Sequence, residues 1–312
     1  MGYVAVDLGG SHISYGITEN GALIDSADFS ISDATYLAPE LPRLKIKLEQ
    51  MIAGWGRPLE GIGLGFCGIV DERANRVVST NGKYIDAPQI DFSEWARSSF
   101  GLPILLANDA RMALRGEMLA GAARDELNVV MITLGTGIGG VAAVDGRLPN
   151  GAHGFAASLG GHMPVALTGR RCTCGGLGCA ESEASGWALP ALCREQPDFC
   201  DSKLAMADLN FRNLFECAAE GDAVALRIRD HCLHVWALAT VSAVLSYDPS
   251  MVVFGGGVMQ AADIVLPSIR RYVERNAWTP HGAPRLVMAQ LGNQAALLGV
   301  ERLFREKPQA DV

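Results

Sequence analysis

Three of the eight cysteines lie within the stretch CTCGGLGC, and their spacing is suited to metal binding. Cys172, Cys174 and Cys179 follow His162, which stands ten residues before the first of them. One imidazole nitrogen and three thiolates are a donor set of tetrahedral zinc, and four protein ligands leave no position for a reactive water. A redox C-x-x-C pair is absent, since the spacings are C-x-C and C-x4-C. We therefore predict a structural zinc ion. A disulfide or a coincidence is the alternative.

Three glycine-rich turns follow apolar runs and offer a second kind of chemistry. They are Asp7-Leu8-Gly9-Gly10-Ser11, Gly135-Thr136-Gly137-Ile138-Gly139-Gly140 and Gly255-Gly256-Gly257. Without side chains, the backbone can approach a phosphate closely and donate N–H groups to its oxygens. The middle turn matches G-x-G-x-x-G, but VAAV then continues as a strand, which disfavours a dinucleotide-binding oxidoreductase. We expect the turns to hold a triphosphate. Tight hairpins without a ligand are the alternative.

Asn108 and Asp109 stand where the strand-like run PILLAND meets a helical pattern. An Asp in this place can simply cap the helix. Phosphoryl transfer, however, needs a carboxylate that accepts the proton of the attacking hydroxyl and a neighbouring group that orients it. The pair is therefore a candidate for a catalytic base and its partner.

The order of elements suggests that an α/β unit is duplicated. Residues 3–23 read as strand, glycine turn, strand, turn and strand, and residues 128–148 repeat that pattern. Leu8-Gly9 and Leu134-Gly135 lie 126 positions apart, and Asn20-Gly21 and Asp145-Gly146 lie 125 apart. Chance similarity of two glycine hairpins is the alternative. We expect a small domain over 1–109, completed by a C-terminal helix over 293–312, and a larger domain over 110–292 that carries the cysteine loop.

Further elements follow from periodicity and turn residues. The patterns predict helices over about 35–52, 92–100, 182–194 and 222–247, and strands over 61–70 and 251–259. The apolar stretch 234–245 is about twelve residues long, which suits a buried helix and is too short to span a bilayer.

Composition excludes several classes of protein. The chain has 312 residues, 49% of them hydrophobic, and a net charge of −8. This acidic balance argues against a protein that mainly grips nucleic acid or an anionic membrane. The first ten residues, MGYVAVDLGG, lack the basic segment of a signal peptide. We therefore expect a cytoplasmic protein, in whose reducing surroundings clustered cysteines favour metal over disulfide.

Taken together, these motifs resemble the ROK family of sugar kinases and sugar-responsive repressors over essentially the whole chain. The resemblance is carried by DLGGS, GFCGIVD, AND, LGTGIGG, GAHG, CGGLGCAE with the preceding histidine, and GGGVM. It implies a duplicated actin-like (ribonuclease H-like) fold of two α/β domains, with ATP and Mg²⁺ bound in the cleft between them, and phosphorylation of a sugar hydroxyl.

The resemblance also implies roles for individual residues. Asp109 becomes the catalytic base, and His162 binds zinc with one ring nitrogen and the sugar with the other. Asp7 lies close to the Mg²⁺ ion. The implied sugar contacts are Asn81, Asn108, Asp109, His162 and Glu181. The implied ATP contacts are Asp7, Gly9, Gly10, Ser11, His12, Thr136, Gly137, Gly139, Gly255, Gly256 and Gly257.

Two departures from the family pattern affect the substrate. Family kinases usually carry Glu-x-Gly-His, whereas this chain reads AASLGGH, so that Ser158 or Leu159 takes the place of the glutamate. A serine contacts a hydroxyl without the charge-assisted bond of a carboxylate. The usual lysine after the first turn is replaced by His12. His12 and GAHG resemble the D-allose kinase branch, so the expected substrate is a D-allose-like hexose phosphorylated on its 6-hydroxyl.

The missing glutamate also keeps a second function open. A catalytically weak sugar-binding or sugar-sensing protein of the same fold would not need it. Family repressors carry a winged-helix segment before the first turn, and here the turn begins at Asp7, so we expect no DNA binding. The expected partners are a small sugar, ATP and a second copy of the chain in a homodimer.

Overall fold

The computed structural model describes residues 1–306, which form two compact units. The first contains Met1–Glu126, Leu148–Ser158 and the chain from Gln290 onward, and the second contains Leu127–Arg147 and Leu159–Ala289. The first unit thus continues past residue 109, where the sequence suggests a boundary. The reason is that the helix after that point packs along the C-terminal helix, which belongs to the same unit.

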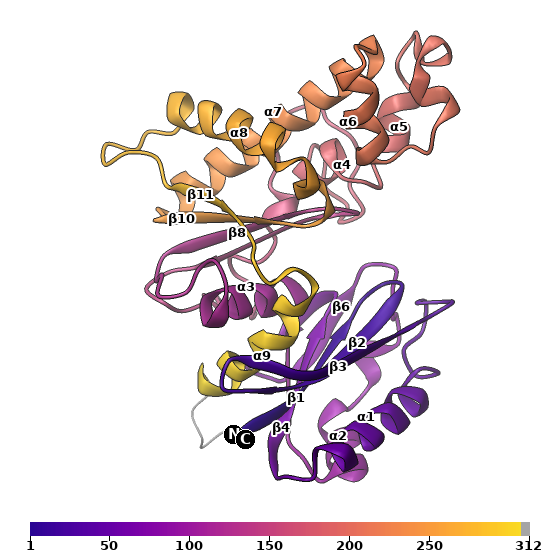
Figure 1. Ribbon diagram of the computed structural model, residues 1–312, viewed down its shortest axis with the longest axis vertical. Helices are drawn as coiled ribbons and strands as arrows, with labels where there is room; N and C mark the ends of the chain where they lie inside the picture. Colours follow the sequence, from indigo (N-terminus) through magenta and orange to yellow (C-terminus); the bar gives the residue numbers. More distant parts are fainter. Residues whose placement is uncertain (307–312) are drawn as a thin grey trace. The chain divides into compact units, whose positions relative to one another are not determined.

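The first unit is built on a five-stranded sheet of order β3-β2-β1-β4-β7 (Figure 1). Its strands are β1 (Gly2–Leu8), β2 (His12–Glu19), β3 (Ala22–Ser30), β4 (Leu59–Phe66) and β7 (Ile104–Asn108), with a separate ladder of β5 (Gly68–Asp71) and β6 (Arg76–Thr80). β1, β2 and β3 pair antiparallel, while β1, β4 and β7 run parallel. The helices are α1 (Leu41–Trp55), α2 (Phe92–Phe100), α3 (Asp109–Ala120) and α9 (Ala295–Glu306).

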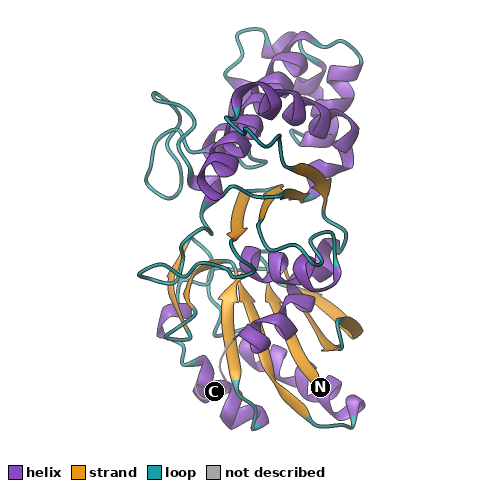
Figure 2. Cartoon of the chain, turned by 90° about the vertical axis from the view of Figure 1, so that its left-hand side faces the viewer, coloured by secondary structure: helices purple, strands orange, loops and turns teal. Residues whose placement is uncertain are grey.

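The second unit has a four-stranded sheet of order β11-β10-β8-β9. The strands are β8 (Val129–Leu134), β9 (Ile138–Ala143), β10 (Met251–Gly255) and β11 (Arg285–Met288). The helices are α4 (Ala180–Ala184), α5 (Leu189–Arg194), α6 (Phe211–Ala219), α7 (Ala223–Tyr247) and α8 (Ala262–Asn276). α7 and α8 contact the sheet and each other, and the helices of this unit gather on one side of its strands (Figure 2).

The two sheets repeat one arrangement, as the duplicated pattern predicts. β8 pairs antiparallel with β9 and parallel with β10, as β1 does with β2 and β4. The closing turns also match, because Asn20 and Gly21 have φ of 55° and 78°, and Asp145 and Gly146 have 51° and 75°. Two consecutive positive φ values define the type I′ hairpin turn.

The prediction of a third strand near residue 147 is wrong, however. Val144 and Arg147 form only an isolated bridge, after which the chain enters the first unit. There Arg111 donates hydrogen bonds to the carbonyl oxygens of Leu148 and Pro149, at 3.4 and 2.8 Å. A proline also lacks the N–H that a sheet ladder needs.

The alternation GIGLGF in β4 explains how helix α9 packs on the first sheet. On one face, Leu64 joins the buried cluster that includes Leu44 and Leu48 of α1. On the other face stand glycines, and a Cβ on Gly63 would lie 2.5 Å from Val300 of α9. The absence of these side chains therefore lets α9 lie directly on the strand.

Several predicted boundaries shift. The helix expected from 35 begins only at Leu41, with a proline in its first turn. The strand expected over 61–70 is interrupted at Cys67, and that expected over 251–259 ends at Gly255, where a 3-10 turn follows. The C-terminal helix expected over 293–312 begins at Ala295 after a 3-10 turn, and its last six residues lie outside the described part of the chain.

The helix expected over 182–194 is two helices, α4 and α5. The break has a long-range cause, since the N–H groups of Gly186 and Trp187 donate to the carbonyl oxygens of Gly135 and Thr136, at 2.9 and 3.0 Å, instead of continuing a helix.

The expected buried helix over 222–247 is confirmed as α7, with Asp222 as its N-cap. Among the described residues, none of the helices has both the length and the apolar composition that crossing a bilayer requires.

Candidate functional site

Acidic side chains of the first unit meet where its parallel strands end. Asp7 stands near the end of β1, directly before the turn at Gly9, and Asp109 follows the last residue of β7. Gly65 of β4 is the partner of Asp7 in the ladder, and a Cβ on it would lie 3.0 Å from Asp7 Oδ1. The glycine therefore makes room for the Asp7 carboxylate. The carboxyl end of parallel strands is where open α/β sheets bind ligands.

The carboxylate of Asp7 lies in an unfavourable environment for a negative charge. Its Oδ1 is buried and has no hydrogen-bond partner among the described residues. Burial, followed by the neighbouring charge of Asp109, raises the pKa of Asp7 to about 7. A carboxylate of this kind, with an orphaned buried oxygen, fits a place beside a cation such as Mg²⁺.

Asp109 is fixed in position by hydrogen bonds to one of its two oxygens. Its Oδ1 accepts from the side-chain amide of Asn108 and from the N–H of Ala110, both at 2.8 Å. Burial raises the pKa of Asp109, and the two bonds oppose that shift. The carboxylate is thus held rigidly while its pKa moves toward neutrality, as a general base requires.

The helix cap at this point is Asn108 rather than Asp109. Asn108 Oδ1 accepts from the N–H groups of Ala110 and Arg111, at 3.0 and 3.2 Å, and its Nδ2 also donates to the carbonyl oxygen of Gly68 at 3.1 Å. Asp109 is the first residue of α3. Capping therefore does not account for the aspartate.

Lys83 is a residue of this region that the sequence patterns do not single out. A Cβ built on Gly10 would lie 2.0 Å from its Nζ, so the lysine side chain lies against the first glycine turn. Burial raises the pKa of both Asp109 and Cys67, and the nearby charge of Lys83 offsets part of that rise. In the sequence, Lys83 is part of the loop NGKY, and no local pattern there indicates that its side chain reaches the glycine turn.

The other predicted ligand contacts of the first unit lie on exposed loops or form hydrogen bonds within their own loop. Ser11 Oγ and His12 Nδ1 lie 3.0 Å apart and are exposed. Asn81 is exposed in the loop after β6. Ser158 is buried, and its hydroxyl donates to the carbonyl oxygen of Phe155 at 2.6 Å. The hydroxyl proton of Ser158 is therefore already used in a hydrogen bond within its own loop.

In the second unit, the other two glycine turns lie side by side. Gly256 has φ of 91°, and a Cβ on it would lie 2.2 Å from the carbonyl oxygen of Leu134, at the end of β8. Gly135 and Gly257 face open space, since an added Cβ on either meets nothing within 4 Å. The ends of β8 and β10 therefore present bare backbone together.

Glu181 lies against the second turn. Its Oε2 accepts from the N–H of Ile138 at 3.0 Å, and its Oε1 accepts from the indole N–H of Trp187 at 3.3 Å. A Cβ on Gly137 would lie 2.7 Å from Oε2. The carboxylate thus holds the shape of the turn that the sequence predicts to bind ATP.

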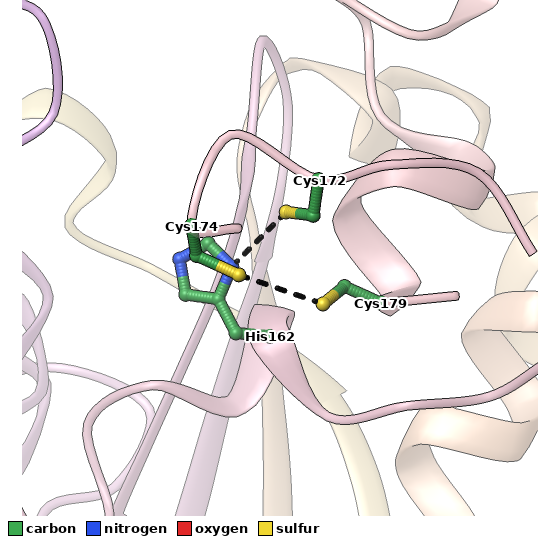
Figure 3. Close-up of side chains that lie close together, drawn as sticks. All are labelled: His162, Cys172, Cys174 and Cys179. Carbon is green, nitrogen blue, oxygen red and sulfur yellow. Dashed lines mark hydrogen bonds between the residues drawn. The ribbon is translucent and has the colours of Figure 1, made fainter. Parts of the chain in front are cut away.

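The four predicted zinc ligands converge, as Figure 3 shows. Their donor atoms all lie within 4.8 Å of one another, with Cys174 Sγ and Cys179 Sγ at 3.7 Å and Cys172 Sγ and His162 Nδ1 at 3.5 Å. Ideal tetrahedral zinc places two sulfurs about 3.8 Å apart and a sulfur and a nitrogen about 3.6 Å apart. The cluster therefore has the dimensions of a zinc site, and its cysteines are not joined by a disulfide.

Backbone bonds hold the cysteine loop in this shape. The N–H of Cys172 donates to the carbonyl oxygen of Gly176 at 2.9 Å, and Gly175 and Gly178 have φ of 90° and 65°. Burial raises the pKa of the Cys179 thiol to about 12. Cys179 is also the residue before α4, which carries Glu181. The loop thereby connects the metal ligands to the second glycine turn.

His162 Nδ1 faces Cys172, so the other ring nitrogen, Nε2, points away from the sulfur cluster. The short 3-10 turn Gly160–His162 packs on β9, because the bare Cα atoms of Gly140 and Gly160 meet there: a Cβ on Gly140 would lie 2.7 Å from the Gly160 Cα. The contact of Nε2 with the sugar, which the family resemblance implies, stays a prediction.

Comparisons with known proteins identify the family of the chain. The model of the ROK family matches residues 3–307. A glucokinase of Streptomyces coelicolor is 31% identical, over 97% of this chain and 97% of that protein. The crystal structure of a ROK family glucokinase from Streptomyces griseus in complex with glucose and AMPPNP has a TM-score of 0.77 at 29% identity, covering 98% of this chain and 100% of that one.

Regulators also appear among the relatives. A putative xylose repressor of Caldicellulosiruptor is 26% identical, over 95% of this chain and 76% of that protein. The family match spans nearly the whole described chain, and the solved kinase shares its duplicated, actin-like pair of α/β units. The chain belongs to the ROK family.

Proposed function

We propose that this protein is an ATP-dependent sugar kinase that transfers the γ-phosphate of ATP to a hydroxyl of a hexose. The observation that carries the proposal is the carboxylate of Asp109, which is fixed by Asn108 at the carboxyl end of β7. Kinship to glucokinases at about 30% identity over nearly the full chain supports the reaction class.

Asp109 is the proposed base. The hydrogen bonds from Asn108 and Ala110 both go to Oδ1, so we assign Oδ2 as the oxygen that takes up the proton of the attacking hydroxyl. The raised pKa makes the carboxylate a stronger base than an exposed aspartate. Asn108 positions it and is also a proposed sugar contact. Asn81, Ser158, His162 and Glu181 remain proposed sugar contacts.

ATP is proposed to bind through the glycine turns. In the first unit these are Asp7 to His12, and in the second they are Thr136, Gly137 and Gly139 together with Gly255 to Gly257. Mg²⁺ would be held near Asp7, whose unpartnered oxygen fits it. The ion would neutralise charge on the phosphoryl oxygens.

The sugar is proposed to be a hexose or a hexose derivative. The named relatives include glucokinases and an N-acetylmannosamine kinase, so these sugars belong in any test. D-allose, phosphorylated on its 6-hydroxyl, remains our proposed substrate from His12 and GAHG. Ser158 gives this chain no carboxylate where family kinases usually have one.

Zinc is the proposed structural metal, held by His162, Cys172, Cys174 and Cys179. Its ligands fill the coordination shell, so it would shape the loop rather than activate water. By fixing His162 and the start of α4, it would position side chains around the substrate.

ADP release measured with a panel of hexoses, hexosamines and N-acyl sugars tests the proposal. One or more sugars should support turnover that Asp109→Asn lowers about 10²- to 10⁴-fold. Turnover of no sugar, combined with calorimetric binding of one, would instead support the second candidate, a sugar-sensing protein of the same fold. The similarity to a xylose repressor and the occupied hydroxyl of Ser158 favour that candidate.

A further inference from the structure

We propose that Lys83 supplies the cation that binds the terminal phosphates of ATP at the first glycine turn. The proposal rests on the proposed function and adds to it a residue that no motif of the chain indicates. It also answers a question that the sequence raises, since His12 stands where family kinases carry a lysine.

The geometry places the lysine directly over the turn. A Cβ on Gly10 would lie 2.0 Å from Lys83 Nζ, 2.7 Å from Cε and 3.1 Å from Cδ. The last three heavy atoms of the side chain therefore occupy the space above Gly10. The turn presents its backbone there, and an anion bound to that backbone would meet the ammonium group.

The loop that carries Lys83 is held against the turn by its next residue. Tyr84 is fully buried, and its hydroxyl donates to the carbonyl oxygen of Gly9 at 2.6 Å. Its N–H donates to the carbonyl oxygen of Ala34, also at 2.6 Å. Tyr84 has φ of 51°, a conformation that a bulky residue adopts only where its surroundings impose it. The packing and hydrogen bonds of Tyr84 thus hold the preceding residue, Lys83, next to Gly10.

The charges around this turn require a cation. Asp7 stands directly before the turn, and the charges of Asp7, Asp109 and Lys83 all act on the thiol of Cys67, which follows β4. A triphosphate would bring several further negative charges. The residues that follow Gly10 are Ser11 and His12, which contact each other and carry no permanent positive charge.

Lys83 is available for this role. Its side chain is exposed, and among the described residues it takes part in no salt bridge within 4.0 Å. Its charge favours the ionised form of Asp109. A lysine is a point charge suited to phosphate, and its flexible stem lets it follow a phosphoryl group.

Calorimetric titration of ATP, ADP and AMP into Lys83→Met tests the role directly. Loss of one charge-assisted bond should weaken ATP binding about 10- to 100-fold. AMP should bind as to the wild type, because it lacks the terminal phosphates. Lys83→Arg keeps a cation and should restore most of the ATP affinity. In turnover, Lys83→Met should raise the KM for ATP far more than the KM for sugar.

Lys45→Met is the matched control, since Lys45 lies on α1 and pairs with Glu49 at the surface. It should leave all three affinities unchanged. Unchanged ATP affinity in Lys83→Met, or equal weakening of ATP and AMP, would overturn the role. These titrations need no turnover, so a wild type that binds ATP but phosphorylates no sugar would refute the kinase and leave the assignment of Lys83 standing.

Discussion

The two sheets of this protein end in edges of opposite character. The edge of the first unit carries charged groups, with Asp7 and Asp109 at the ends of β1 and β7 and Lys83 over Gly10. The edge of the second unit presents bare backbone at Gly135 and Gly257. The carboxylate of Glu181, which lies against this edge, accepts hydrogen bonds from Ile138 and Trp187.

This difference shows how a duplicated scaffold can divide one reaction. Proton transfer needs a carboxylate that is a stronger base than an exposed aspartate, and the first edge carries Asp109, whose pKa burial raises. Binding of phosphate or nucleobase needs donors that approach closely, and glycine backbone provides those. The second unit also contains the four predicted zinc ligands, the last of which directly precedes α4. We expect changes at Asp109 to affect chemistry, changes at Lys83 to affect nucleotide binding, and changes at the second edge to affect shape and nucleotide binding.

The largest expected effect is on the second unit, from Cys174→Ser. Removing one of four ligands should lower bound zinc from about one ion per chain to nearly none. Because binding energy at a structural zinc is also folding energy, the melting temperature should fall and sugar binding should weaken with it. Metal analysis of protein purified without chelator, with a thermal melt, measures both.

Cys200→Ser is the control, because Cys200 is an exposed cysteine outside the cluster. It should keep its zinc and its melting temperature. A wild-type protein that is fully folded and free of metal would refute the zinc assignment.

Asp109→Asn should have the next largest effect, confined to the first unit's chemistry. The amide keeps the shape of the side chain but has no basic oxygen. General-base catalysis typically contributes about 10²- to 10⁴-fold, so kcat should fall by that factor while the sugar KM changes little. Steady-state kinetics with the best sugar of the panel provide the measurement.

Asp91→Asn separates catalysis from helix capping. Asp91 is the N-cap of α2 and accepts from the N–H of Glu94 at 2.9 Å. Asparagine caps nearly as well as aspartate, so this variant should keep full activity. Equal rates for Asp109→Asn and the wild type would show that another group is the base.

Features that depend on local spacing could be predicted from the sequence. The cysteines and the histidine lie within one short segment, and a turn with two glycines brings their donor atoms together. The duplication was readable because Asn20-Gly21 and Asp145-Gly146 are turn residues of one type. Asp109 was predicted to follow a strand and begin a helix, and it does.

Features that depend on distant contacts could not be predicted. Lys83 reaches Gly10 only because Tyr84 is buried and bonded to Gly9. The break between α4 and α5 results from bonds to Gly135 and Thr136, which leave no local signal. The missing third strand of the second unit likewise reflects carbonyl oxygens bound by Arg111, from a helix far earlier in the chain.

Asp7→Asn tests whether the buried charge of Asp7 destabilises the folded chain. The folded pKa of Asp7 is about 7, above its ordinary value of 3.8, so ionisation destabilises the folded chain. Stability from this group is therefore lost as pH rises from about 4 through 7. The variant should match the wild type near pH 3.5 and exceed it at pH 8, by at most about 4 kcal/mol at about 1.4 kcal/mol per pKa unit. Urea denaturation at both pH values measures this.

Asp33→Asn provides a control of opposite sign. Asp33 accepts from the N–H and the hydroxyl of Thr35, and these bonds lower its pKa. Its loss should reduce stability above pH 4 rather than increase it. If Asp7→Asn is no more stable than the wild type at pH 8, the buried charge of Asp7 does not destabilise the folded chain.

The smallest expected effect is on the second edge, from Gly137→Val. A Cβ there would lie 2.7 Å from Glu181 Oε2, so the carboxylate must move and release the N–H of Ile138. The loss of this hydrogen bond, together with a side chain that blocks the approach of ATP to the backbone, should raise the KM for ATP about tenfold. We expect kcat and the fold to be largely unchanged. Gly54→Val is the control, since Gly54 lies on α1 and an added Cβ meets nothing within 4 Å.

A double variant that combines Glu181→Gln with Gly137→Val tests how Glu181 acts. If Glu181 acts by holding the turn, the double variant should have the same KM for ATP as Gly137→Val alone. Additive losses would mean that Glu181 acts elsewhere, as the proposed sugar contact requires, and an unchanged KM for ATP in Gly137→Val would remove this turn from the nucleotide site.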